Sequence, residues 1–393
     1  MPAILPELIV LFLSVALLAW TWAVYTALMV SRAKRAVVTA GRSAPPAAIP
    51  RSFSVVVATR DEPSVIVARV RNLLDLPDRR QATDIIVAVD HRATWPLSAY
   101  RDALGTTARV VAGDAPGGKA TALNAGVRAS ACDVVVLADS KQFFEPGSID
   151  ALMDALSEPG VGGVSGTVRQ SSGDATLDAY WRTDTLIRRG QSADHSVVTT
   201  TGQISAFMRT QYPTLPDNLI CDDLYATAAV VMQGQRVTFA EHAVAIDDRT
   251  FTRTQNLQRK IRTLSGLVQV CQLLPAIMSP SRNPIWMHFV SQKLLRLATP
   301  LLLMTAGWAT VSIMLPLVFS AEASTARLVA LVAFLPLLTV ALPIGVAARV
   351  FGPAAFLWVL LVALYNGLRR DFDVWHSHAA PGELTAELRG NGA

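Results

Sequence analysis

The chain has 393 residues, of which 51% are hydrophobic and 17% charged, and its formal net charge is +5. Soluble globular proteins carry about a quarter charged residues, so this composition excludes a disordered chain and indicates contact with lipid. The small basic excess predicts no nucleic-acid surface, and it is sufficient to orient a membrane protein. The cysteines lie far apart without a CxxC motif, so neither a disulfide framework nor a zinc site is predicted.

An apolar segment near the N-terminus is predicted to anchor the chain in a membrane. Residues 8–30 contain no charged side chain and are long enough to cross a hydrocarbon core of about 30 Å. Arg32, Lys34 and Arg35 follow at once. Because basic flanks stay on the cytoplasmic side, we expect residues 1–31 to be an uncleaved plasma (inner) membrane anchor, followed by a cytoplasmic domain.

Residues 52–265 have ordinary polarity, and short β-branched runs alternate there with helical patterns. The predicted strands are 52–59, 84–89, 108–112 and 134–138, and the helical patterns lie near 64–76, 119–130 and 148–156. This alternation predicts an α/β fold with a mostly parallel sheet and helices on both faces. Ligands bind at the carboxyl ends of such strands, where Asp61, Asp90 and Asp139 are found.

Apolar sequence returns after this polar domain. Residues 266–296 contain an amphipathic pattern that predicts helices lying in the membrane interface. Residues 297–368 are predicted to form two or three transmembrane helices, and residues 369–393 a polar tail. The pair Arg369-Arg370 would lie outside after three crossings, against the positive-inside tendency, so the number of crossings of this multi-pass protein stays open.

The glycine-rich segment before residue 119 has two interpretations. Residues 113–120 nearly form a phosphate-binding P-loop between a predicted strand and a predicted helix. That motif requires Ser or Thr directly after the lysine to bind magnesium, and Ala120 cannot do so. A P-loop NTPase is therefore disfavoured, and the alternative joins Lys119 to the residues that follow it.

Residues 118–126, GKATALNAG, resemble the GKxxALNxG segment of family-2 glycosyltransferases, which are inverting enzymes with a Rossmann-like GT-A fold. Further segments resemble the same family in the same order. They are 55–63 (VVVATRDEP), 86–94, 134–149 (VVVLADSKQFFEPGSI), 202–209 (GQISAFMR), Asp222-Asp223-Leu224 and 259–263 (RKIRT). The resemblance covers about residues 52–300, and the flanking apolar segments are similar to the hyaluronan, chitin and cellulose synthase branch.

The resemblance implies that the chain binds a nucleotide-sugar donor. The residues expected at its base, ribose and diphosphate are Arg60, Asp61, Glu62, Asp90, Lys119, Asn124, Asp139 and Lys141. Carboxylates among them can accept N–H and O–H hydrogen bonds from base and ribose. Arg259, Lys260 and Arg262 are expected to pair with the leaving diphosphate, because arginine contacts phosphate through two parallel hydrogen bonds.

The metal requirement is left open by the sequence. Asp139 stands at the first acidic position of the family's D-x-D motif, where the resemblance implies a Mg²⁺ or Mn²⁺ ion with the diphosphate. The second acid is missing, because residue 141 is lysine. Either Asp139 holds the ion together with the diphosphate, or Lys141 neutralises the phosphate charge directly.

The resemblance implies that Asp223 is the general base and that Asp222 flanks it. Inverting transfer needs a carboxylate that takes the proton of the acceptor hydroxyl as this hydroxyl attacks the anomeric carbon. The structural alternative for Asp223 is a helix N-cap, since a helical pattern follows it. Gly202, Phe207 and Arg209 are expected to line the acceptor pocket, and a core position is the alternative for Phe207.

These features predict a membrane-bound inverting hexosyltransferase that moves a sugar from a UDP-sugar to a glycan or lipid-linked acceptor. The product would belong to cell-surface polysaccharide or glycolipid synthesis, with the lipid bilayer and export-complex proteins as further partners. One alternative is a non-processive glycolipid synthase, favoured by Lys141 and by Thr263, which replaces the tryptophan of the last motif. Another is a non-catalytic nucleotide-binding partner of a polysaccharide-export complex.

Overall fold

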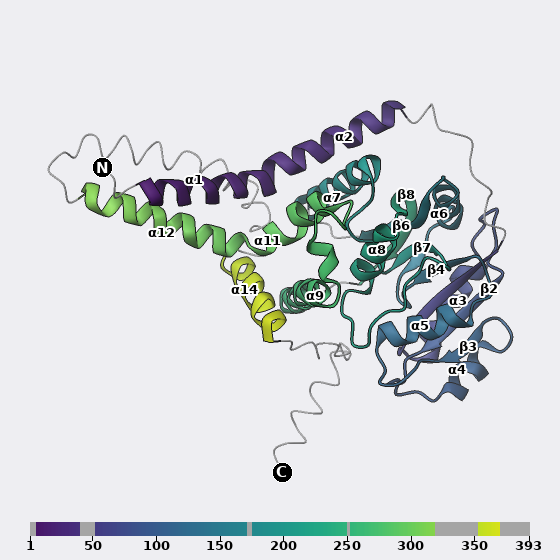
Figure 1. Ribbon diagram of the computed structural model, residues 1–393. Coiled ribbons are helices and arrows are strands. Elements are labelled where there is room, and N and C mark those ends of the chain that lie inside the picture. The colour runs from purple at the N-terminus through teal and green to yellow at the C-terminus, as the bar shows by residue number, and fades with distance from the viewer. Residues whose placement is uncertain (1–4, 40–51, 171–174, 250–251, 319–352, 370–393) are drawn as a thin grey trace, which may run out of the picture.

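The computed structural model describes residues 5–39, 52–170, 175–249, 252–318 and 353–369 (Figure 1). An eight-stranded sheet forms the centre of the polar domain, in the order β3-β2-β1-β4-β7-β6-β8-β5. Its strands are β1 (Phe53–Thr59), β2 (Asp84–Val89), β3 (Arg109–Ala112), β4 (Val134–Ala138), β5 (Phe143–Phe144), β6 (Val161–Gln170), β7 (Ile204–Met208) and β8 (Arg236–Asp247). The helices of this domain are α3 (Pro63–Leu74), α4 (Leu97–Leu104), α5 (Lys119–Ala129), α6 (Ser148–Leu156), α7 (Ala175–Asp194), α8 (Asp222–Met232) and α9 (Arg253–Leu273).

The sheet is mixed in direction. Strands β3, β2, β1 and β4 are parallel neighbours, as the sequence predicts. Strand β7 runs antiparallel to both β4 and β6, and β8 is parallel to β6 but antiparallel to β5. The prediction of an α/β fold is therefore confirmed, whereas parallel pairing is confined to the first half of the sheet and to the β6–β8 pair.

Alternate side chains of the central strands pack into two cores on opposite faces of the sheet. In β1, Val55 and Val57 belong to the core that α3, α4 and α6 cover, and Val56 belongs to the core that α5, α8 and α9 cover. Because both faces are buried, these strands are continuous apolar runs and do not alternate with polar residues. The strand ends therefore carry the first polar groups at this edge of the sheet.

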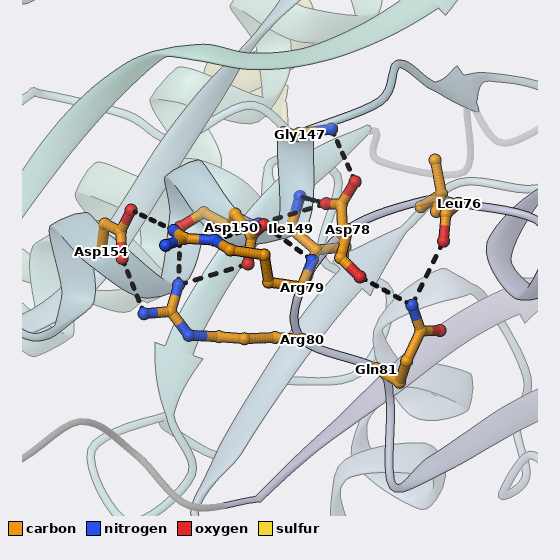
Figure 2. A network of polar contacts seen from close by, with 9 residues as sticks. All are labelled: Leu76, Asp78, Arg79, Arg80, Gln81, Gly147, Ile149, Asp150 and Asp154. Atoms are coloured by element: carbon orange, nitrogen blue, oxygen red, sulfur yellow. Dashed lines mark hydrogen bonds and ion pairs between the residues drawn. The ribbon is translucent and has the colours of Figure 1, made fainter.

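Helix α6 is capped by a loop that is distant in sequence (Figure 2). The carboxylate of Asp78 accepts hydrogen bonds from the backbone N–H groups of Gly147 at 2.5 Å, Ile149 at 2.7 Å and Asp150 at 3.2 Å. Gly147 itself has a φ of 84° and offers no side-chain cap. Arginines from the same loop then pair with acids of α6, namely Arg79 and Arg80 with Asp150 and Asp154.

The N-terminal residues form one long helix, made of α1 (Leu5–Ala19), the π-helical turn η1 (Trp20–Val24) and α2 (Tyr25–Thr39). Within the described ranges, Leu5–Ala36 is long and apolar enough to cross a membrane. A second span arises only if Trp286–Leu297 and Thr299–Met314, which are bent by 63°, count as one. The predicted anchor at residues 1–31 overlaps this helix and stays a prediction.

The C-terminal apolar region is described in part. Helix α12 (Thr299–Val318) packs along α1, and α14 (Pro353–Arg369) packs on α9 (Figure 1). The predicted span within 319–352 and nearly all of the predicted polar tail lie outside the described residues. The two or three C-terminal crossings therefore stay a prediction.

Residues 266–296 connect these helices to the polar domain. The predicted boundary at 265 falls inside α9, which continues to Leu273. The elements that follow are the 3₁₀ turn η3 (Pro275–Met278), α10 (Trp286–Phe289), the π-helical turn η4 (Val290–Leu294) and α11 (Leu295–Leu297). Val270, Ile285 and Phe289 are buried in the core beneath α5 and α8, so these apolar side chains face the polar domain.

Helix α2 docks on α7 of the polar domain (Figure 1). The two backbones approach most closely at Gly190, where an added Cβ would lie 2.1 Å from the carbonyl oxygen of Met29. Polar contacts flank this crossing. Gln191 donates a hydrogen bond to the Tyr25 hydroxyl at 2.6 Å, and Arg32 pairs with Asp194 at 2.5 Å. The long N-terminal helix is thus fixed to the polar domain through α2.

Candidate active site

Three acidic residues lie at the carboxyl ends of neighbouring parallel strands. Asp61 follows β1, Asp90 follows β2 and Asp139 follows β4, and these strands are adjacent in the order β2-β1-β4. The parallel register of β1 with both neighbours places the three ends at one edge of the sheet. The three carboxylates thus lie at one edge of the sheet, as the sequence predicts, and their negative charges are concentrated there.

Lys119 joins the strand end of β4 to the start of α8. As the first residue of α5, it places its Nζ 2.9 Å from Oδ1 of Asp139 and 3.4 Å from Oδ2 of Asp222. Burial alone would lower the pKa of Lys119, but the carboxylates of Asp139 and Asp222 raise this pKa above its usual value. Burial raises the pKa of Asp222, against the opposing effect of Lys119. Gly202 also lies here, because an added Cβ would be 3.1 Å from the Lys119 Nζ.

Asp223 lies in the first turn of α8, directly after Asp222. Its Oδ1 accepts the backbone N–H of Leu224 at 2.8 Å, and its carbonyl oxygen accepts the Thr227 hydroxyl at 2.7 Å. The N-cap of α8 is Cys221, so the helix-cap alternative for Asp223 is not what the structure shows. Negative charge is favoured in this first turn by the helix dipole. The second carboxylate oxygen accepts no hydrogen bond from any described residue, which leaves it available to a ligand.

Asp90 is 2% exposed and is wrapped by the glycine-rich loop before α5. Its Oδ1 accepts the backbone N–H groups of Gly118 at 2.8 Å and Arg92 at 3.1 Å. Gly117, with a φ of 89°, passes so close that an added Cβ would lie 2.8 Å from this oxygen. The other oxygen, Oδ2, is buried without a hydrogen-bond partner in the described part of the chain. Such orphaned acceptors are rare and indicate a missing donor.

Asp61 is held by residues that follow β4. Lys141 Nζ lies 2.6 Å from Oδ1 of Asp61, and the Ser140 hydroxyl donates to Oδ2. The adjacent Glu62 is exposed at the start of α3, where it accepts the Ser64 hydroxyl. Lys141 stands at the sequence position of the second D-x-D acid. In the structure it forms an ion pair with Asp61, which follows β1.

Helix α9 brings basic residues to the same region. Burial lowers the pKa of Arg259, which is repelled by Arg249 and attracted by Asp247 and Asp139. Burial also lowers the pKa of Arg60, which is attracted by Asp90 and Asp61 and repelled by Arg262. Lys260, between these arginines in the sequence, is half-buried on the same helix. Arg259 thus interacts with Asp139 after β4, and Arg262 with Arg60 after β1.

The end of β8 adds residues that the sequence analysis missed. Arg249 donates to both carboxylate oxygens of Asp247, at 2.7 and 2.8 Å, and Gln142 donates to the same group at 3.0 Å. Burial would lower the pKa of Arg249, but these bonds to Asp247 raise it. The sequence signal for Asp247 is an acid directly at a strand end, the same signal that marks Asp61, Asp90 and Asp139.

Three predicted site residues are placed elsewhere. Both amide atoms of Asn124 bond the backbone of Leu215, at 2.8 and 2.9 Å, so this side chain fixes a loop. Phe207 is fully buried in the core, which corresponds to its structural alternative. Arg209 donates to the carbonyl oxygen of Cys132 at 2.7 Å. Because β7 is antiparallel to β4, residue 209 follows the strand past the amino end of β4, away from Asp139.

Comparisons with known proteins agree with this architecture. The family described as "Glycosyltransferase like family 2" matches residues 50–269. A mannosyltransferase from Pyrobaculum calidifontis, solved with GDP-Man and Mn²⁺, is 21% identical, with 91% of this chain and 99% of that chain covered and a TM-score of 0.63. Glucosyl-3-phosphoglycerate synthase from Mycobacterium tuberculosis, solved with Mn²⁺, UDP and glucosyl-3-phosphoglycerate, is 17% identical, with 56% and 80% covered and a TM-score of 0.41.

No curated protein matches the chain significantly in sequence. At the identity of the Pyrobaculum enzyme, the structural likeness shows a Rossmann-like GT-A fold and no more. The family match covers more than half of the chain and includes all the strand ends described above. The chain therefore belongs to the glycosyltransferase family 2-like proteins.

Proposed function

We propose that the chain is a membrane-bound inverting hexosyltransferase that moves a sugar from a UDP-sugar to a glycan or lipid-linked acceptor. The observation that carries this proposal is the position of Asp223, which has an available carboxylate oxygen and lies beside the Lys119–Asp139–Asp222 cluster. A base next to a half-buried cation is the arrangement that acceptor activation beside a leaving diphosphate needs. Cell-surface polysaccharide or glycolipid synthesis is the proposed setting.

The donor nucleotide is proposed to lie across the carboxyl ends of β2, β1 and β4. The orphaned Oδ2 of Asp90 would accept an N–H from the base, and this removes the cost of a buried unpaired oxygen. Asp61 and Arg60 would face the ribose. The diphosphate would lie among the cations at the other end, namely Lys119, Lys141, Arg249, Arg259 and Arg262, which form charge-assisted hydrogen bonds to phosphate.

Transfer is proposed to occur in a single displacement at the anomeric carbon. Asp223 takes the proton of the acceptor hydroxyl, and the oxygen of that hydroxyl forms the new bond to the anomeric carbon. The bond between the anomeric carbon and the donor phosphate oxygen breaks, and the nucleoside diphosphate leaves with the electron pair. Lys119 and the arginines stabilise the negative charge that develops on the leaving group. One displacement inverts the configuration of the sugar.

The membrane setting is supported by apolar side chains on the outer faces of two packed helices. The exposed ones include Leu5, Leu8 and Phe12 of α1 and Met304 and Trp308 of α12. Exposed apolar side chains in this number suit hydrocarbon and are costly in water. The basic residues after the anchor favour a cytoplasmic location for the domain at the plasma (inner) membrane. A lipid-linked acceptor would then reach Asp223 from the bilayer.

A non-processive glycolipid synthase is a second candidate, and one contact favours it. Thr263 replaces the tryptophan that the family resemblance places at the acceptor site. Its hydroxyl donates to the Arg259 carbonyl oxygen at 2.9 Å within α9, so it offers no aromatic surface on which a sugar chain could stack. Product length separates this candidate from a polymerase.

The proposal is tested by a donor screen with the full chain in membranes that contain their native lipids. UDP- and GDP-sugars are supplied one at a time, and both nucleoside diphosphate release and sugar incorporation into lipid are measured. We expect incorporation from one donor class and a product with the opposite anomeric configuration. A folded, nucleotide-binding protein that transfers from no donor would contradict an enzymatic role and favour a non-catalytic partner.

A further inference from the structure

The carboxylates at the diphosphate end of the site already contact cations of the protein. Asp139 pairs with Lys119 at 2.9 Å, and Asp61 pairs with Lys141 at 2.6 Å. Asp222 shares Lys119 with Asp139, at 3.4 Å, and Asp247 is bound on both oxygens by Arg249. Each acid that could contribute to a D-x-D metal site thus has an ammonium or guanidinium as its nearest ionic partner.

These residues do not fit a divalent ion well. Mg²⁺ requires six oxygen ligands in near-ideal geometry and is usually held by one or two carboxylates together with substrate phosphates. The described residues contain no group of three His, Cys, Asp or Glu side chains arranged to hold a metal. An added divalent ion at Asp139 would also be repelled by Lys119, and by Arg249 and Arg259, whose charges interact with this same carboxylate.

We propose that this site binds the donor diphosphate without a divalent ion, and that Lys119 and Lys141 provide the two positive charges that the ion would supply. This inference rests on the proposed donor site. Lys141 is the distinctive residue, because it stands where the family motif has its second acid. Its side chain is 41% exposed, so its ammonium can turn from Asp61 to a phosphate oxygen. Asp61 keeps its hydrogen bond from Ser140 when this happens.

The test is nucleotide-diphosphate binding to the full chain in detergent, measured by titration calorimetry with UDP and with GDP. Each titration is made once with EDTA and once with Mn²⁺. We expect one of the nucleotides to bind with dissociation constants that agree within about twofold between the two conditions. Lys141→Met should weaken binding about tenfold or more, because a charge-assisted hydrogen bond to phosphate is lost. Lys141→Arg, which keeps the charge, should bind within a fewfold of the unmodified chain.

The matched control is Arg79→Met, which also removes one positive charge. The Arg79 side chain is 74% exposed and pairs with acids of α6 (Figure 2), so UDP or GDP binding should be unchanged. Thermal unfolding of each variant separates lost binding from lost folding. If Lys141→Met does not fold, Lys141→Asp is used. This variant restores the second acid and should bind weakly in EDTA but gain affinity with Mn²⁺.

Three results would overturn the inference. Binding that requires Mn²⁺ would leave the proposed donor site standing and refute the metal-free site alone. Unchanged metal-free binding by folded Lys141→Met would show that Lys141 does not contact the diphosphate. Absence of UDP and GDP binding in both conditions would refute the inference together with the proposed function.

Discussion

At the residue scale, the carboxylates at the strand ends differ in what they contact. Three of them pair with a lysine or an arginine, whereas Asp90 accepts hydrogen bonds from the backbone of Gly118 and Arg92 and keeps one buried oxygen without a donor. A buried acceptor of this kind costs free energy until a ligand donates to it. Nucleotide binding should therefore depend strongly on one atom, the Oδ2 of Asp90.

Asp90→Asn tests this dependence. If the amide oxygen keeps the backbone bonds of Oδ1, an NH₂ group replaces the free acceptor, and affinity for UDP or GDP should fall about tenfold or more. Titration calorimetry measures the effect, and thermal unfolding should show a retained fold. Asp102→Asn removes one negative charge from an exposed position of α4 and should bind as the unmodified chain does. Equal affinity of Asp90→Asn would remove Asp90 from the donor site.

Sequence patterns predicted some site residues and not others for a physical reason. Asp61, Asp90 and Asp139 follow short apolar strands, and parallel strands necessarily bring such ends together. Arg209 follows a strand as well, but the antiparallel direction of β7 carries it to the other edge. Asn124 lies on the predicted helix, yet its partner Leu215 is distant in sequence. Strand direction and long-range loop contacts are set by packing that a single sequence does not reveal.

At the element scale, α6 depends on Asp78 for the hydrogen bonds at its N-terminus. Asp78→Ala removes an acceptor for three backbone N–H groups and should lower the free energy of unfolding by about 1–2 kcal/mol. Denaturant unfolding of the purified chain measures this loss. Donor binding should not change, since α6 covers the face of the sheet opposite α5 and α8. An unaltered stability would mean that water satisfies these N–H groups equally well.

The contact between α2 and α7 depends on the absence of a side chain at Gly190. Gly190→Val would place its Cβ 2.1 Å from the Met29 carbonyl oxygen, far inside van der Waals contact. The helices must therefore separate, which should lower the free energy of unfolding by about 1–3 kcal/mol. The expected result is a lower unfolding temperature, measured by thermal denaturation of the purified chain. Gly307→Ala in α12 is the matched control, because nothing lies within 4 Å of its added Cβ. Similar stability of the two variants would contradict a tight α2–α7 crossing.

At the scale of the whole molecule, the composition divides into a polar α/β domain and apolar helices that extend from it (Figure 1). Periodicity and run length were sufficient to predict both parts, and also the first half of the sheet. The second half was not predicted, because glycines interrupt the apolar residues of β6 and charged residues interrupt those of β8. The burial of residues 266–296 against the polar domain was not predicted either. An amphipathic helix has the same sequence pattern whether its apolar face packs on a protein domain or on a bilayer.

The proposed orientation of the domain can be tested in sealed membrane vesicles. Arg101→Cys places a thiol on the exposed surface of α4, whereas Cys132 and Cys221 are buried and Cys271 is half-buried. We expect an impermeant maleimide to label this thiol in inside-out vesicles and not in right-side-out vesicles. The unmodified chain provides the background. Labelling only in right-side-out vesicles would contradict a cytoplasmic domain.

The central claim is that Asp223 is the base of a sugar-transfer reaction. It is tested most directly by comparing sugar incorporation and nucleotide binding for Asp223→Asn, with Asp217→Asn, an exposed acid just before α8, as control. The account predicts that Asp223→Asn lowers turnover by about 10²–10⁴-fold, as expected for loss of a general base, while UDP or GDP binding stays within about threefold. Near-normal turnover of folded, nucleotide-binding Asp223→Asn would contradict it.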